Sequence, residues 1–75
     1  MRTEDERKFD LLVGRRIMLA RKGRKIRGVT LAKHAGLSFQ RLYWIESGGR
    51  CPLYVLAQIA AALGVRVSEL LPVAF

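Results

Sequence analysis

The stretch from Gly36 to Gly48, near the middle of the chain, holds the side chains best suited to recognise another molecule. Gln40 has an amide that both donates and accepts hydrogen bonds, and Arg41 has a cation with several donors. Three aromatic rings lie in the same stretch, at Phe39, Tyr43 and Trp44. These residue types bind a surface by hydrogen bonds and ring contacts, but they do not form a nucleophile with its base or a carboxylate pair. The stretch therefore indicates recognition rather than catalysis.

The rest of the chain lacks the residues that a catalytic or metal site requires. The single cysteine, Cys51, cannot form an internal disulfide, and together with the single histidine, His34, it is too little for an ordinary zinc site. A reactive thiol at Cys51 is less favoured than a structural one, because no base or second cysteine accompanies it. No glycine-rich loop follows a strand pattern, which argues against nucleotide chemistry. We expect no enzymatic activity, no metal, no cofactor and no small-molecule ligand.

The charge of the chain favours a polyanionic partner. Lys and Arg number 14 against 6 Asp and Glu, which gives a net charge of +8 and a sequence pI near 10.9. An anionic membrane is the alternative polyanion, but the sequence has no long apolar segment, signal peptide or lipidation motif. We therefore expect a soluble, cytoplasmic protein that binds nucleic acid.

The residues from Gly36 to Ser38 predict how the recognition stretch is positioned. Glycine adopts the left-handed conformation that ends a helix, and a serine oxygen accepts the first free amide hydrogens of the next helix. In the helix over 38–47, Leu42 and Ile45 share one side at helical spacing. The three aromatic rings lie on the other side. Burial in the core is the ordinary alternative for such rings, but exposure is favoured because Leu42 and Ile45 already occupy the inner side.

Hydrophobic periodicity predicts four more helices around this one. Residues 1–8 are charged and form either a flexible tail or the solvated first turns of a first helix, since Thr3 and Glu6 have capping-box spacing. Residues 72–75 form an apolar tail. The predicted helices besides 38–47 are a first helix that ends near Gly23, a short one over 29–35, one over 53–63 ended by Gly64, and a last short one capped by Ser68 and closed by Pro72. The chain is thus predicted to be a single all-α domain over residues 1–75.

The helix over 53–63 is apolar on more than one face. One stripe consists of Leu53, Leu56, Ile59, Ala60 and Leu63. The other face carries Tyr54, Val55, Ala61 and Ala62. The short helix over 29–35 is predicted to bury Leu31, Ala32 and Ala35.

Several motifs occur in a fixed order along the chain. They are Leu31-Ala32, Ala35-Gly36-Leu37-Ser38, Ile45-Glu46-x-Gly48, Arg50-x-Pro52, Ala62-Leu63-Gly64-Val65 and Ser68-Glu69-Leu70-Leu71. In this order the sequence resembles the Cro/repressor-type (XRE-like) helix-turn-helix regulators over about Val13 to Leu71. The resemblance implies a lambda-repressor-like DNA-binding domain, a compact five-helix bundle with a helix-turn-helix motif. That fold also occurs in antitoxins and in domains that bind no DNA.

The resemblance further implies the site residues. The start of the helix over 38–47 would enter the major groove, with base contacts at Phe39, Gln40, Arg41, Tyr43 and Trp44. Phosphate contacts are expected at Arg24, Lys25, Arg27, Ser38 and Arg50. A buried ion pair is expected between Arg21 and Glu46, because the family pairs this glutamate with an arginine of the first helix.

The chain departs from the family pattern at one point before the recognition stretch. The family usually opens its second helix with Thr or Ser and a Gln, whereas this chain has Arg27 and Gly28 there. This predicts a delayed start of that helix, at Val29 or Thr30, and leaves the family's glutamine contact without a counterpart.

The apolar content predicts association between two copies. A hydrophobic fraction of 51% is more than one small core can hide in 75 residues. The predicted dimer interface consists of Val65, Val67, Leu70, Leu71, Val73 and Phe75. A monomer whose tail folds back over its own core is the alternative.

Two functions from different classes are compatible with these features. The favoured one is a sequence-specific transcriptional regulator that binds double-stranded DNA as a homodimer on a palindromic operator. The alternative is a helix-turn-helix module, such as an antitoxin, whose aromatic face binds a protein. Salt dependence separates the two, because duplex binding through phosphates weakens steeply with salt.

Overall fold

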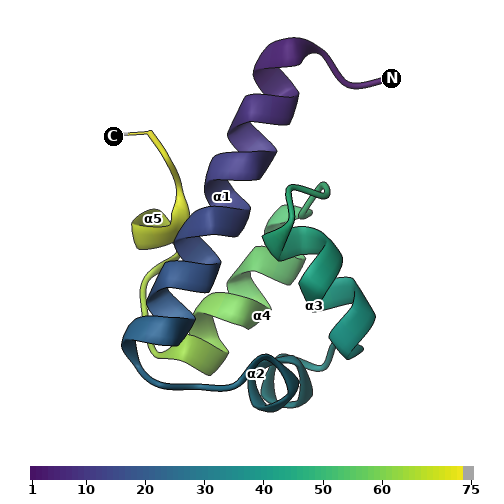
Figure 1. Ribbon diagram of the computed structural model, residues 1–75. Coiled ribbons are helices and arrows are strands. Elements are labelled where there is room, and N and C mark those ends of the chain that lie inside the picture. The colour runs from purple at the N-terminus through teal and green to yellow at the C-terminus, as the bar shows by residue number, and fades with distance from the viewer. Residues whose placement is uncertain (74–75) are drawn as a thin grey trace.

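A computed structural model of the chain describes residues 1–73 (Figure 1). These residues form five α-helices, and none of them lies in a strand. The prediction of an all-α, five-helix domain with a helix-turn-helix is confirmed. The helices are α1 (Glu4–Gly23), α2 (Gly28–Ala35), α3 (Phe39–Glu46), α4 (Leu53–Leu63) and α5 (Val67–Leu70).

The first helix starts at the predicted capping box. The Thr3 hydroxyl accepts a hydrogen bond from the Glu6 backbone N–H at 3.1 Å, and the Glu6 carboxylate accepts one from the Thr3 N–H at 2.9 Å. Both groups satisfy amides that the first turn of a helix leaves free. The charged residues that follow Thr3 are therefore the first turns of α1 rather than a flexible tail.

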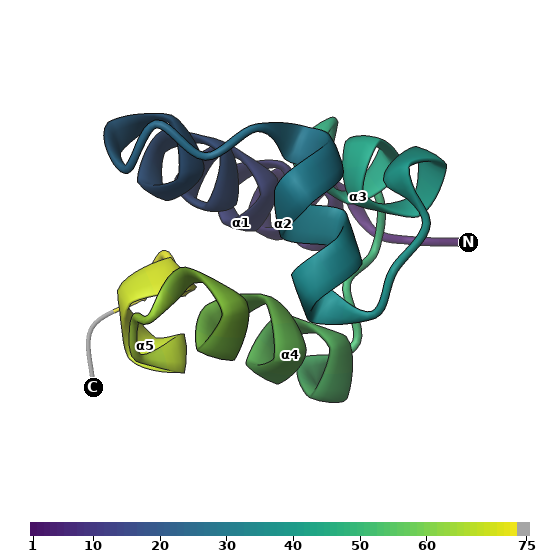
Figure 2. The ribbon, with the colours of Figure 1, turned by 90° about the horizontal axis from the view of Figure 1, so that it is seen from below.

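The helices lie in two layers (Figure 2). One layer contains α1, α2 and α3, and the other contains α4 with α5 beside it. The second layer packs under the first, since α4 contacts α2 and α1, and α5 contacts α1 and α4. In both views α3 and α5 lie on opposite sides of the molecule, so their outer surfaces face different directions.

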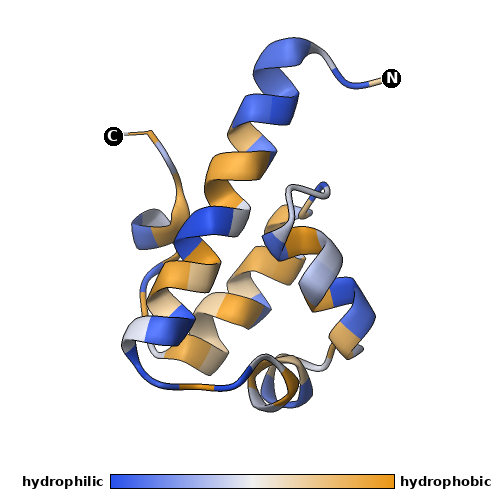
Figure 3. Cartoon of the chain, viewed as in Figure 1, coloured by the Kyte–Doolittle hydropathy of each residue, from blue (hydrophilic) through white to orange (hydrophobic). Residues whose placement is uncertain are grey.

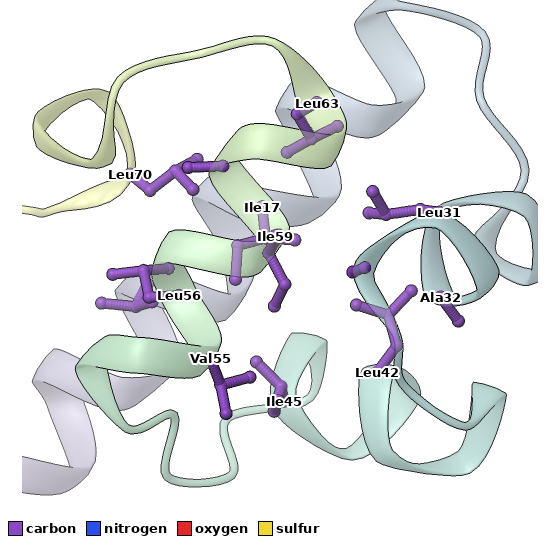
Figure 4. Packing of buried hydrophobic residues seen from close by; sticks show 13 residues of the cluster. Ile17, Leu31, Ala32, Leu42, Ile45, Val55, Leu56, Ile59, Leu63 and Leu70 are labelled. Atoms are coloured by element: carbon purple, nitrogen blue, oxygen red, sulfur yellow. The ribbon is translucent and has the colours of Figure 1, made fainter.

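The core lies between the two layers (Figure 4). Colouring by hydropathy shows that α4 is apolar along most of its length, whereas the first turns of α1 are hydrophilic (Figure 3). The 13 buried hydrophobic residues are Val13, Ile17, Leu31, Ala32, Ala35, Leu42, Ile45, Val55, Leu56, Ile59, Ala60, Leu63 and Leu70. The inner residues predicted for α2 and α3 are all in this set.

A glycine sets the distance between α1 and α3. A Cβ atom on Gly14 would overlap the carbonyl oxygen of Ile45 and lie 2.8 Å from that of Glu46. Real side chains do not tolerate such contacts, so only glycine allows the two helices to pack this closely. The close approach brings the end of α3 against α1.

The buried side of α4 does not coincide with the stripe seen in the sequence. Leu53 of the stripe is 68% exposed, whereas Val55 of the other face is 1% exposed and lies in the core. Leu56, Ile59, Ala60 and Leu63 of the stripe are buried. The reason is that α4 has apolar side chains nearly all round, so its periodicity does not distinguish the inner face from the outer one.

Two predicted helix starts also differ from the structure. α2 begins at Gly28 rather than at Val29 or Thr30, after an extended Arg27 whose side chain makes no capping hydrogen bond. α5 begins at Val67 instead of being capped by Ser68, and the Arg66 N–H donates to the Glu69 carboxylate at 2.7 Å. No helix within residues 1–73 has the length and apolarity needed to cross a membrane.

Candidate nucleic-acid interface

The turn between α2 and α3 has the geometry that its residues predict. Gly36 is left-handed, with φ 73° and ψ 28°, and the Leu37 N–H donates to the Ala32 carbonyl at 2.8 Å. Ser38 is extended, and its hydroxyl accepts a hydrogen bond from the Arg41 N–H at 3.1 Å. Both helix ends are satisfied within three residues, so the turn fixes the direction of α3 relative to α2.

The outer side of α3 carries the aromatic residues. Phe39, Tyr43 and Trp44 are 48%, 64% and 52% exposed, while Leu42 and Ile45 on the inner side are fully buried. Gln40, Arg41 and Ser47 are exposed as well. Exposure of the three rings, favoured over burial in the core, is confirmed. We call the exposed surface of Phe39, Gln40, Tyr43 and Trp44 the aromatic face.

Phe39 packs over the start of α2. A Cβ atom on Gly28 would lie 3.0 Å from Cε1 of the Phe39 ring, which is closer than side-chain contacts normally come. The Phe39 and Tyr43 rings are 6.3 Å apart between centroids, with their planes tilted by 42°. Such tilted pairs are favourable. Gly28, which departs from the family pattern, thus leaves the space that the Phe39 ring uses.

Trp44 packs against the loop after α3. Gly49 is buried, and a Cβ atom there would overlap carbons Cδ2 and Cε2 of the indole ring. The Gly49 N–H also donates to the Trp44 carbonyl at 2.8 Å. Sequence reasoning missed this contact, although two consecutive glycines after the helix are a signal for a close approach of backbone and ring.

An ion pair joins α1 to the end of α3. Arg21 Nε lies 2.8 Å from Glu46 Oε2, and Arg21 Nη2 lies 3.0 Å from Glu46 Oε1, which makes the pair bidentate. Arg21 Nη1 also donates to the Ile26 carbonyl at 3.0 Å. The two side chains are only 14% and 10% exposed. Its hydrogen bond to Glu46 raises the pKa of Arg21, so the guanidinium remains charged.

Cations dominate the part of the chain that contains α2 and α3. No Asp or Glu lies between Asp10 and Glu46, and Glu46 itself is paired with Arg21. Arg24, Lys25 and Arg27 are exposed in the loop before α2. This loop ends next to Gly28, over which Phe39 packs, so its positive charge lies beside the start of α3.

Solved structures of other proteins share this arrangement. The restriction-modification controller protein C.AhdI from Aeromonas hydrophila is 28% identical, with a TM-score of 0.77 over 80% of this chain and 92% of that one. The hypothetical transcription factor NHTF from Neisseria is 25% identical, with a TM-score of 0.79 over 95% and 83%. The clp gene regulator ClgR from C. glutamicum is 22% identical, with a TM-score of 0.80 over 83% and 82%, a likeness of fold alone. No protein-family model and no curated protein matches the chain.

The chain has the Cro/repressor-type helix-turn-helix fold. The resemblance inferred from its sequence motifs is therefore confirmed at the level of structure. The three similar structures are described as regulators or as a transcription factor, not as enzymes. In this fold α2 and α3 form the helix-turn-helix, and α3 occupies the position of the recognition helix.

Arg50, which follows the recognition helix, forms an ion pair with α1. Arg50 Nη2 lies 2.6 Å from Glu6 Oε2, and both side chains are exposed. Arg2 makes a second link, since its Nη1 lies 2.8 Å from Asp10 Oδ2 and donates to the Gly48 carbonyl at 3.0 Å. Hydrogen bonds from Thr3, followed by the one from Arg50, lower the pKa of Glu6. The loop after α3 is thus connected to the start of α1.

Cys51 faces a small hollow between this loop and α1. Its thiol is half-buried, and burial raises its pKa to about 11, so it stays protonated near neutral pH. Its Sγ donates weakly to the Pro52 carbonyl at 3.7 Å, and it does not cap α4, whose N-cap is Pro52. These features favour the structural interpretation of the thiol. Within residues 1–73, no three His, Cys, Asp or Glu side chains are grouped so that they could hold a metal.

The residues predicted for a dimer interface divide into three groups. Val65, Val67 and Leu71 are half-buried, and Val73 is exposed. Leu70, the last residue of α5, is a core residue instead, because it is only 1% exposed and belongs to the buried cluster. Phe75 lies outside the residues that the structure describes.

Proposed function

We propose that this chain is a transcriptional regulator that binds double-stranded DNA in a sequence-specific manner through α3. The observation that carries the proposal is that Gln40 and Arg41 are exposed on α3, within a stretch of chain rich in cations and free of acidic residues. A major groove admits a helix of this kind, and its phosphates attract the surrounding cations. The fold shared with regulators supports the same function.

Base contacts would come from the aromatic face and Arg41. Gln40 would bond adenine through two hydrogen bonds, and Arg41 would bond guanine or a phosphate. Phe39 would rest on a thymine methyl group, with Tyr43 and Trp44 beside it. The family usually makes a glutamine contact from the position of Gly28. Because Gly28 has no side chain, the Phe39 ring would occupy that space instead.

Phosphate contacts would come from both sides of α3. Arg24, Lys25 and Arg27 would approach one strand, and Ser38 lies at the turn where the backbone of α3 begins. Arg50 would approach the backbone from the other side. To do so it would exchange the Glu6 carboxylate for a phosphate, an exchange between two exposed ion pairs that costs little.

We also propose that the regulator acts as a homodimer on a palindromic operator. The half-buried and exposed apolar residues Val65, Val67, Leu71 and Val73 would contribute to the interface. The outer side of α4 extends this surface, because Leu53 and Tyr54 are exposed. A two-fold arrangement would bring two recognition helices about 34 Å apart, which matches half-sites roughly ten base pairs apart.

Selection from random duplexes, followed by a salt titration, tests the proposal. We expect enriched sites with two-fold symmetry, and affinity that falls linearly in the logarithm of salt concentration. Gln40→Ala should alter the preferred base at one position in each half-site, with a loss of about 1–3 kcal/mol of discrimination. Arg50→Ala should weaken all duplexes alike and flatten the salt slope. Failure to enrich any duplex would refute the function.

The exposed rings favour one second candidate, a module that binds a protein as an antitoxin does. Exposed aromatic surface is typical of protein interfaces. An interface of this kind responds little to salt, so the same titration separates the two functions.

A further inference from the structure

We infer that the aromatic face selects duplexes by the C5 methyl groups that pyrimidines present in the major groove. The inference rests on the proposed function, and it assigns the class of DNA site that α3 would bind. Three observations carry it: the rings are anchored from beneath, they surround a single amide, and cations but no free carboxylates accompany them.

Two of the rings are held in place by glycines. Trp44 lies over Gly49 at a distance that a Cβ atom would not allow, and Phe39 lies over Gly28 at 3.0 Å from where a Cβ atom would be, closer than most side-chain contacts. Tyr43 is tilted against Phe39 at 6.3 Å. Because each of these rings has a neighbour beneath or beside it, little freedom remains to be lost on binding. The rings present a preformed surface that is apolar except for the Tyr43 hydroxyl and the Trp44 indole N–H.

The aromatic face has one hydrogen-bonding amide, at Gln40, among three rings. A major groove presents hydrogen-bonding groups at every base pair, and its only apolar group is the methyl on C5 of thymine. 5-Methylcytosine carries a methyl group at the same ring position. Rings pressed against base edges that lack a methyl group would leave polar groups without partners, which costs free energy. Half-sites with methyl groups beneath the rings would therefore be preferred.

The charges around the aromatic face favour DNA over a protein as its partner. No acidic residue lies between Asp10 and Glu46, and the Glu46 carboxylate is bound by Arg21. Arg27, which precedes the Gly28 that Phe39 packs over, and Arg41 on α3 are both exposed. Apolar rings within a cationic border complement the apolar methyl groups and the phosphate borders of a groove.

The test removes methyl groups without changing any hydrogen bond. Duplexes are first enriched from a random pool made with thymine, and the enriched duplexes are then resynthesised with deoxyuridine in place of thymidine. Each methyl group lost from a contact should weaken binding about fourfold, since one buried carbon contributes roughly that factor. Two contacts should therefore weaken it more than about tenfold.

A second pool, made with uracil and 5-methylcytosine, identifies the source of the methyl group. Enrichment of 5-methylcytosine where the first pool held thymine would show that either source is bound. A thymine-to-uracil difference without that enrichment would assign the preference to thymine alone. Both results support the inference.

Tyr43→Ala and Phe39→Ala test whether the rings are responsible. Either variant should reduce the ratio of thymine to uracil affinity toward one. Leu19→Ala is the control, because Leu19 on α1 is 59% exposed, similar to Tyr43 at 64%, and belongs to neither proposed contact surface, so it should leave the ratio unchanged. Melting curves establish that each variant is folded.

Two results would overturn the inference and leave DNA binding intact. They are equal affinity for the thymine and uracil duplexes, and an unchanged ratio in both Tyr43→Ala and Phe39→Ala. Failure of the wild-type chain to enrich any duplex would instead refute the proposed function, and the inference with it.

Discussion

Tyr43 on α3 and Tyr54 on α4 are exposed to nearly the same extent, but the surfaces around them differ. Tyr43 belongs to a part of the chain where cations occur without acidic residues, from Leu11 to Ile45. Tyr54 belongs to a run without any charge, from Cys51 to Val65. The surface around Tyr43 suits a polyanion. The surface around Tyr54 suits the same apolar surface on a second copy of the chain. The charges near an exposed ring thus indicate its partner better than exposure does.

The two helices also differ in how they are fixed. α3 is joined to α1 by the Arg21–Glu46 pair and the close packing at Gly14. α4 is fixed by its buried side chains, among them Val55 and Ile59. A polar and steric anchor sets the position of the aromatic face, whereas apolar burial sets that of α4. Substitutions that disrupt the anchor of α3 should therefore have different effects from substitutions on α4.

The largest effect is expected from Arg21→Met. The substitution leaves the Glu46 carboxylate nearly buried and without its partner, which should reduce the free energy of unfolding by about 3–5 kcal/mol. Glu46→Gln should destabilise for the same reason. Chemical denaturation measures both. The control is Lys33→Met, an exposed charge on α2 whose loss should cost less than about 0.5 kcal/mol. Near-wild-type stability of both Arg21→Met and Glu46→Gln would contradict this role of the pair.

A smaller loss is expected from Gly49→Ala, which tests the anchor of Trp44. The new methyl group would displace the indole ring, at a cost of about 1–3 kcal/mol from overpacking. Because Trp44 is the only tryptophan, its fluorescence spectrum reports the displacement directly. Gly23→Ala is the matched control, since nothing lies within 4 Å of a Cβ atom there. Unchanged fluorescence in Gly49→Ala would show that the ring is not held by the loop.

The features that could be predicted from the sequence are those set by residues close together in the chain. Gly36 and Ser38 act through the backbone groups next to them, so the turn and the direction of α3 followed from their chemistry. Leu42 and Ile45 could be assigned inward because they share one side of the helix at helical spacing, apart from Gln40 and the aromatic rings. On α4 no such contrast exists, and the periodicity groups the exposed Leu53 with buried residues and separates the buried Val55 from them.

Contacts between distant residues were harder to predict. At Gly28 the sequence predicts only the absence of the family's glutamine contact. The structure shows that Gly28 leaves space for the ring of Phe39, eleven residues later. Leu70 belongs to the predicted interface because the chain has more apolar residues than one small core can hide, but its burial depends on where α5 packs. Local patterns do not contain this information.

The next prediction concerns the outer side of α4. Leu53→Arg places a charge on the uncharged run and should weaken the proposed dimer at least tenfold, or about 1.4 kcal/mol. Helix content should not change, because Leu53 is 68% exposed. Sedimentation equilibrium at micromolar concentration measures the effect. Leu19→Arg, at a leucine of α1 that is 59% exposed, is the control. A monomeric wild-type mass, or equal effects of both variants, would contradict this interface.

The smallest effect is expected at Arg50, the last charge before the uncharged run. The pKa of its partner Glu6 lies below the ordinary value of 4.5 because Thr3 and Arg50 donate hydrogen bonds to the ionised carboxylate. A carboxyl group with a lowered folded-state pKa stabilises the fold above its unfolded pKa, and this stabilisation is lost as the pH falls through the lowered value. Melting temperatures of the wild type and Glu6→Gln should therefore differ slightly near neutral pH and converge well below pH 4.5.

The same variant tests whether Arg50 exchanges Glu6 for a phosphate. Glu6→Gln should free Arg50 and strengthen duplex binding by about twofold, the size expected for an exposed ion pair. Glu4→Gln makes the same change of charge one residue after Thr3, at a position that forms no ion pair within residues 1–73. If both variants strengthened binding equally, the gain would come from net charge alone. Only a larger gain in Glu6→Gln, abolished by adding Arg50→Ala, would show that the Glu6 carboxylate and the DNA backbone compete for Arg50.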